Sequence, residues 1–67
     1  MSPDANRILD FLASAGPYAN TTAEKEVVRE ILLTTGGSVL QHGRLMNVVA
    51  KHIGAGVYKL TLSAANP

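Results

Sequence analysis

The chain must fold around one small hydrophobic core, because it has only 67 residues and contains no cysteine. A domain of roughly 60 residues buries barely enough surface to fold alone, and without cysteines no disulfide can add to its stability. We therefore expect a single small domain over residues 1–67. No apolar run approaches the about 20 residues that cross a bilayer, and the opening Met1-Ser2-Pro3-Asp4 lacks the features of a secretion signal. We expect a cytoplasmic protein with no membrane partner.

Charged side chains are divided unevenly between the two halves of the chain. Residues 1–34 have a net charge of −2, with five acidic and three basic side chains. Residues 35–67 have a net charge of +3, from Arg44, Lys51 and Lys59, and contain no acidic residue. A short chain with this asymmetry can present a positive surface to an anionic partner such as DNA.

The first segment has the signals of an amphipathic helix. Ser2 is suited to cap its N-terminus, Pro3 to occupy the first helical position, and Asp4 to face the positive end of the helix dipole. Apolar residues recur at three- and four-residue steps at Ala5, Ile8, Phe11, Leu12 and Ala15. Gly16-Pro17 predicts the end of this helix.

A second helix is predicted before Gly36-Gly37, which would stop it. Thr21 and Glu24 have the spacing of a capping box, in which each side chain satisfies a backbone donor of the other residue. One helix face is apolar and consists of Ala23, Val27, Val28, Ile31 and Leu32. Leu33 lies off this face, and we interpret it as an exposed side chain or a contact for a partner.

Residues 38–53 have the periodicity of a third helix, with Ser38 as a candidate cap. Its apolar side would consist of Leu45, Met46, Val49, Ala50 and Ile53. Its polar side would carry Arg44, Asn47 and Lys51, with His52 at the margin. Arginine and lysine neutralise phosphates, and arginine and asparagine read base edges. The pattern predicts a basic helix face that binds DNA; the alternative is a solvated helix face.

The C-terminal residues 57–62 have the period-two pattern of a half-buried strand, because Tyr58, Leu60 and Leu62 alternate with polar side chains. A strand needs a partner for its backbone hydrogen-bonding groups. One candidate is the segment Ser38–Gln41, with His42-Gly43 as a turn, which would make the middle of the chain a small sheet. The other candidate is the same strand from a second copy in a homodimer.

Two runs of residues resemble the helix-turn-helix of Fis-type DNA-binding domains. They are Ile31-Leu32-Leu33-Thr34-Thr35-Gly36-Gly37-Ser38 and Gly43-Arg44-Leu45-Met46-Asn47-Val48. The resemblance matches Gly36-Gly37 to the first turn of that motif and Asn47-Val48 to its second turn. It implies that Val49, Ala50, Lys51 and His52 enter the major groove.

A second alignment to a helix-turn-helix motif fits the sequence, because the run Ala50-Lys51-His52-Ile53-Gly54 resembles the Ala-x-x-x-Gly of repressor-type helix-turn-helix segments. The C-terminal strand is accommodated by a third resemblance, to winged-helix domains, in which strand residues such as those from Gly56 to Leu60 follow three helices. We therefore expect a mainly α fold: a three-helix, helix-turn-helix core with a C-terminal β-strand, similar to a winged helix.

Catalytic signals are weak. His42 and His52 are ten residues apart and no cysteine is present, so the spacing of a zinc site is missing. The glycine-containing stretches lack the spacing of a phosphate-binding loop. We expect a binding protein with no cofactor and no metal rather than an enzyme.

Two functions follow from these patterns. The first is a small DNA-binding transcriptional regulator that acts as a homodimer through a basic helix face. Its predicted DNA contacts are Arg44, Asn47, Lys51, His52 and Lys59. The second is a protein-interaction module, such as a small adaptor or inhibitor, that uses the edge of the C-terminal strand. The predicted contacts for a partner or a second copy are Leu33, Tyr58, Leu60 and Leu62.

Overall fold

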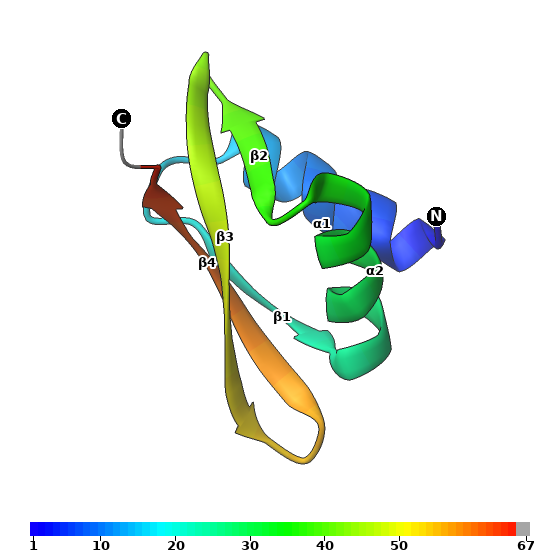
Figure 1. Ribbon diagram of the computed structural model, residues 1–67. Helices are drawn as coiled ribbons and strands as arrows, with labels where there is room; N and C mark the ends of the chain where they lie inside the picture. Colours follow the sequence, from blue (N-terminus) through cyan, green and yellow to red (C-terminus); the bar gives the residue numbers. More distant parts are fainter. Residues whose placement is uncertain (66–67) are drawn as a thin grey trace.

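Two helices and four strands make up residues 1–65, which are the part of the chain described by the computed structural model. In chain order they are α1 (Pro3–Ser14), β1 (Asn20–Glu24), α2 (Lys25–Thr35), β2 (Ser38–Gln41), β3 (Arg44–Gly54) and β4 (Val57–Ala64). The fold is therefore α+β, with one helix before the first strand and the other after it (Figure 1).

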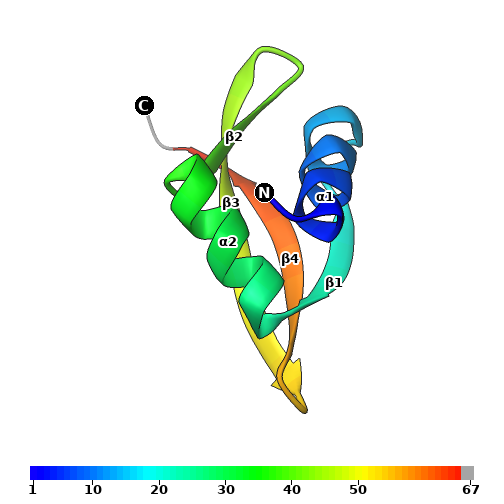
Figure 2. The ribbon, with the colours of Figure 1, turned by 90° about the vertical axis from the view of Figure 1, so that its right-hand side faces the viewer.

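The four strands form one antiparallel sheet in the order β1-β4-β3-β2. Figures 1 and 2 show that both helices lie on the same side of this sheet. The opposite face carries no helix within residues 1–65, and we call it the open face. The β3–β4 hairpin is the longest pairing, and its far end extends beyond the helices (Figure 1).

The core lies between the helices and the sheet face that they cover. Leu12, Ile31 and Leu60 are its largest fully buried side chains and come from α1, α2 and β4. The other buried apolar residues are Ala5, Ile8, Ala23, Val28, Met46 and Leu62. Burial of these side chains is the main favourable contribution to folding in a chain without disulfides.

Local signals define α1 as predicted. Ser2 is its N-cap, and the Ser2 Oγ accepts a hydrogen bond of 3.2 Å from the Ala5 N–H. Pro3 is its first residue. The end of α2 is also confirmed, because Gly36 is the C-cap with φ of +67°, a conformation that glycine adopts without steric cost.

The start of α2 was predicted wrongly. Thr21 forms no capping box, because residues 20–24 form strand β1, in which Thr21 is paired with Leu60 of β4. The helix begins only at Lys25, and its N-cap residue Glu24 makes no capping hydrogen bond with its side chain. Pairing of a threonine-containing strand with a distant partner outweighs the local helix signal.

The mainly α, three-helix expectation is wrong, because residues 38–53 form β2, a turn and most of β3. Side chains on β3 alternate between the two sheet faces. Met46 is buried and Ala50 is half-buried against the core, whereas Leu45 and Val49 are exposed on the open face. The two sets of apolar residues that we had joined into one helix face thus lie on opposite sides of a strand.

The segment Ser38–Gln41 is a strand, but its partner is β3 rather than β4. The predicted turn is present: His42 and Gly43 have φ of +50° and +80° and connect the paired residues Gln41 and Arg44. Two such residues fit the tight hairpin turns whose twist matches that of the strands.

The expected free edge of the C-terminal strand does not exist. β4 lies between β1 and β3, so both of its edges are paired over residues 57–61, and residues 62–64 pair with β3. Leu60 is fully buried and Leu62 is 8% exposed, which places both side chains in the core. They are therefore not available to a partner at a strand edge.

Candidate functional site

Lys51 of β3 and Lys59 of β4 are direct partners in the antiparallel register and lie on the open face. Both are exposed, and neither forms an ion pair within residues 1–65. Like charges directly opposite each other destabilise a sheet. An anionic partner that contacts both side chains would remove this repulsion.

Acidic side chains are nearly absent from the sheet. Strands β2, β3 and β4 contain none, and β1 contributes Glu24 at the end of the strand. The other four acidic residues, Asp4, Asp10, Glu26 and Glu30, belong to the two helices. The open face therefore carries the lysine pair, whereas four of the five acidic residues lie on the helices together with Arg7, Lys25 and Arg29.

The structure brings together three of the five predicted DNA contacts. Asn47 shares the open face with the two lysines, and its Oδ1 accepts a hydrogen bond of 3.4 Å from the Ser38 Oγ. Arg44 and His52 have the opposite parity along β3 and point to the helix side of the sheet. His52 there makes an edge-to-face contact with Tyr58, with ring centres 5.1 Å apart. The basic helix face that we predicted is therefore absent.

An apolar stripe on the open face was missed from the sequence. Its members are Leu40, Leu45, Val49 and Ile53, which are 67%, 53%, 42% and 52% exposed. They follow β2 and β3, whereas β4 contributes Lys59, Thr61 and Ser63 to the same face. The signal was present as every-second-residue alternation, but apolar residues on both sides of β3 concealed it.

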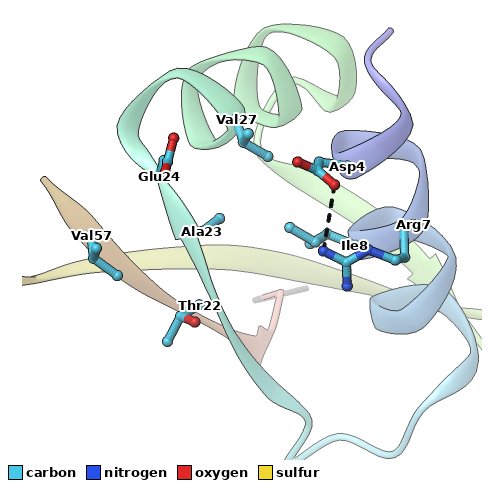
Figure 3. A pocket seen from close by; sticks show the side chains of 8 residues that line it. All are labelled: Asp4, Arg7, Ile8, Thr22, Ala23, Glu24, Val27 and Val57. Atoms are coloured by element: carbon cyan, nitrogen blue, oxygen red, sulfur yellow. Dashed lines mark ion pairs between the residues drawn. The ribbon is translucent and has the colours of Figure 1, made fainter.

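Three surface cavities within residues 1–65 bear on the candidate sites. The first, of about 270 Å³, lies between α1, β1 and α2 (Figure 3). At its rim Arg7 and Asp4 form an ion pair at 3.8 Å, with both side chains about 70% exposed. Glu24 is the third charged side chain of the lining, and Ile8, Ala23 and Val27 give the cavity an apolar side (Figure 3).

The second cavity, of about 380 Å³, lies between α2 and the sheet. Leu33 and Tyr58, two of the four predicted partner contacts, both line it. The third, of about 460 Å³, lies beside the β2–β3 turn, and its lining includes Arg44, His42 and Tyr18. Arg44 is thereby separated from the lysine pair and belongs to a different surface.

Residues 1–65 contain neither a metal-binding cluster nor a membrane-spanning helix. Among residues 1–65, no group of three or more His, Asp or Glu side chains is arranged to hold a metal ion. Neither of the two helices is long and apolar enough to cross a membrane. Comparison of the chain with protein-family models, curated proteins and solved structures gave no match.

Proposed function

We propose that this chain binds double-stranded nucleic acid, DNA in the first instance, through the open face of the β3–β4 ribbon. The observation that carries this proposal is the cross-strand pair Lys51 and Lys59, which has no acidic side chain opposite it on β3 or β4. Phosphates are the anions that such lysines neutralise, with release of bound counterions. Asn47 and Thr61 on the same face supply polar groups for base edges or sugars.

A duplex fits this surface better than a single strand does. Proteins that bind single strands stack bases on exposed aromatic side chains. The aromatic residues here are Phe11 in α1, Tyr18 before β1, and Tyr58 on the helix side of β4, so the open face has no stacking platform. A duplex, by contrast, offers phosphates and sugars to the lysines and the neighbouring polar side chains without any need for base stacking.

The number of contacts sets the affinity that we expect. Two phosphate contacts per chain correspond to a slope of about −1.8 for log K against log salt. Sequence-independent binding typically has a dissociation constant between about 1 and 100 μM at physiological salt, and we expect this chain, with two contacts, to lie at the weak end of that range. A second copy on neighbouring base pairs would add contacts without any change in the site.

Fluorescence anisotropy with a labelled duplex of about 20 base pairs tests the proposal over about 50 to 200 mM NaCl. We expect Lys51→Ala and Lys59→Ala each to reduce the salt slope by about 0.9. Lys25→Ala is the matched control, because Lys25 is an exposed lysine at the start of α2, on the other side of the sheet. Unchanged binding in the double variant Lys51→Ala/Lys59→Ala would exclude the open face as the site.

A further inference from the structure

Strand β3 is longer than the strand that covers its outer edge. Its pairing with β2 ends at Asn47, which is opposite Ser38. One further hydrogen bond, of 2.8 Å, runs from the Val48 N–H to the Gly37 carbonyl. From Val49 to Gly54, β3 is paired with β4 on one side and with no strand on the other side within residues 1–65.

The unpaired backbone groups on this edge can be assigned. In an antiparallel ladder the N–H and C=O of one residue point to the same side, and successive residues alternate. The Val48 N–H points toward β2, so the N–H and C=O groups of Ala50 and His52 point to that side as well. No hydrogen bond to these groups is present within the described residues. They form a short template on which an added strand can pair.

An apolar groove runs beside this edge. It is the cavity of about 380 Å³ between α2 and the sheet, and its floor and walls include Val28, Leu32, Ala50 and Tyr58. Leu33 is 79% exposed at its rim. A strand added to β3 would therefore place every second side chain in this groove, since side chains opposite Ala50 point to the same face as Ala50.

The surroundings of the groove are basic. Lys25 and Arg29 line it from α2, and Lys51 lies on β3 between Ala50 and His52. None of these three side chains forms an ion pair within residues 1–65. Acidic side chains on an added strand would meet uncompensated positive charge on both sides of the edge.

We propose that this edge and groove bind an extended peptide segment of another protein, with apolar side chains at alternate positions and acidic side chains between them. The apolar side chains enter the groove opposite Ala50 and His52. The intervening carboxylate lies on the open face, opposite Lys51. This mode combines backbone pairing for affinity with pockets for alternate side chains for specificity. It does not depend on nucleic-acid binding at the lysine pair.

A second copy of this chain fits the edge less well. Antiparallel pairing of two β3 edges about a twofold axis has two registers that use the free groups of Ala50. One, centred on Ala50, places Lys51 opposite Val49, and neither register brings an acidic side chain to Lys51, because β3 contains none. The other places Ala50 of each copy opposite His52 of the other copy, so that Lys51 lies directly opposite Lys51 of the second copy, while each is already paired with Lys59. Such a cluster of four lysines is unfavourable, whereas an acidic strand removes the repulsion.

The test uses the full chain and a rhodamine-labelled peptide, acetyl-Ser-Val-Glu-Val-Glu-Val-Ser-amide, in an anisotropy titration. We expect saturable binding with a dissociation constant in the range of about 10 to 100 μM, typical of a small interface. A peptide with lysine in place of both glutamates should not bind, because its side chains would meet the like charges of Lys25, Arg29 and Lys51; equal binding of this peptide would overturn the proposal. A peptide N-methylated at alternate backbone positions keeps every side chain but cannot pair with the edge, and we expect it not to bind.

Two variants locate the site on the protein. Arg29→Glu should weaken peptide binding by about tenfold, and Arg7→Glu, a matched charge reversal on α1, should leave it unchanged. Ala50→Pro removes an N–H that no internal pairing uses, so the fold should persist in far-UV circular dichroism while peptide binding is lost. If Ala50→Pro does not fold, Arg29→Glu and the N-methylated peptide still decide the question.

Several results would overturn this proposal. They are equal binding of the N-methylated peptide, equal binding by Arg29→Glu and the unmodified chain, and absence of saturation at about 1 mM peptide. Sedimentation analysis tests whether a second copy of the chain occupies the edge instead of a peptide. A dimer that Ala50→Pro converts to a monomer would show that the edge pairs with a second copy, and it would replace the peptide proposal.

Discussion

The side-chain amide of Gln41 donates a hydrogen bond of 2.8 Å to the carbonyl of Leu12, which lies 29 residues earlier in the chain. The same nitrogen donates a second hydrogen bond, of 3.1 Å, to the Gly16 carbonyl. Gln41 is 4% exposed and is the buried polar residue of the core. It therefore joins the β2–β3 hairpin to the end of α1 and satisfies the Leu12 carbonyl, which the end of the helix leaves without a backbone donor.

Gln41→Leu should consequently destabilise the protein, even though leucine is similar in size and more hydrophobic. The variant leaves the Leu12 carbonyl without its donor, whereas the Gly16 carbonyl keeps the hydrogen bond of 2.9 Å from the Ala19 N–H. A buried unsatisfied group costs about 1 to 3 kcal/mol. Urea denaturation measures the loss in unfolding free energy. Asn6→Ala, which removes an exposed amide with one long hydrogen bond of 3.5 Å, should change it by less than about 0.5 kcal/mol. Equal values for the two variants would contradict this role for Gln41.

Neighbouring positions on α2 should differ sharply in their tolerance of substitution. Ile31 is fully buried and Leu33 is 79% exposed. Ile31→Val removes one buried methylene group and should cost about 0.5 to 1.5 kcal/mol, a measurable fraction of the roughly 3 to 10 kcal/mol expected for a chain of this length. Leu33→Ala should stay within about 0.5 kcal/mol of the unmodified chain in the same urea titration. A larger loss for Leu33→Ala would show that this side chain is covered in solution.

The parts of the fold that were predicted correctly depend on residues close together in sequence. Ser2 and Pro3 specify the start of α1 through a cap and a fixed φ, and Gly36 specifies the end of α2 through positive φ. The His42-Gly43 turn was also visible, because glycine readily adopts the positive φ that such a turn requires. None of these signals requires knowledge of a distant segment.

Strand β3 was not predicted because its apolar spacing fits two structures. Leu45, Val49 and Ile53 are four residues apart, which places them on one side of a helix and also on one face of a strand. Met46 and Ala50 have the same spacing one residue later. A helix merges the two sets into one stripe, whereas the strand separates them onto a core face and an open face. Only pairing with β2 and β4 distinguishes these arrangements.

The candidate sites depend on the same distant pairing. Lys51 and Lys59 are eight residues apart, and their opposition follows from the register of the β3–β4 hairpin. From the sequence, Lys51 was grouped with Arg44, which the strand places on the other face. The open edge at Ala50 and His52 is harder still to predict from the sequence, because it exists only where β3 extends beyond the end of its pairing with β2. Charge composition identified the basic half of the chain but not the geometry within it.

Two glycines next to helix ends should respond in opposite ways to alanine. Gly36 has φ of +67°, so Gly36→Ala should destabilise by about 1 kcal/mol through backbone strain. Gly16 is not in a left-handed conformation, and a Cβ built there meets no atom within 4 Å. Gly16→Ala should therefore be neutral or stabilise by up to about 1 kcal/mol, because it restricts the unfolded chain. Thermal unfolding of both variants checks the contrast, which an equal decrease in Tm would refute.

Replacement of Lys51 by glutamate should raise stability and abolish nucleic-acid binding at the same time. The change converts a like-charge cross-strand pair with Lys59 into an opposite-charge pair, which is worth about 1 kcal/mol in favour of the folded state. Added salt should stabilise the unmodified chain and reduce the difference from Lys51→Glu, since screening weakens both the repulsion and the new attraction. Urea titrations at low and high NaCl measure this dependence, and Lys51→Gln should fall between the two. A Lys51→Glu variant that is less stable than the unmodified chain at low salt would show that the two lysines do not repel each other. The structural basis for an anionic partner on the open face would then be lost.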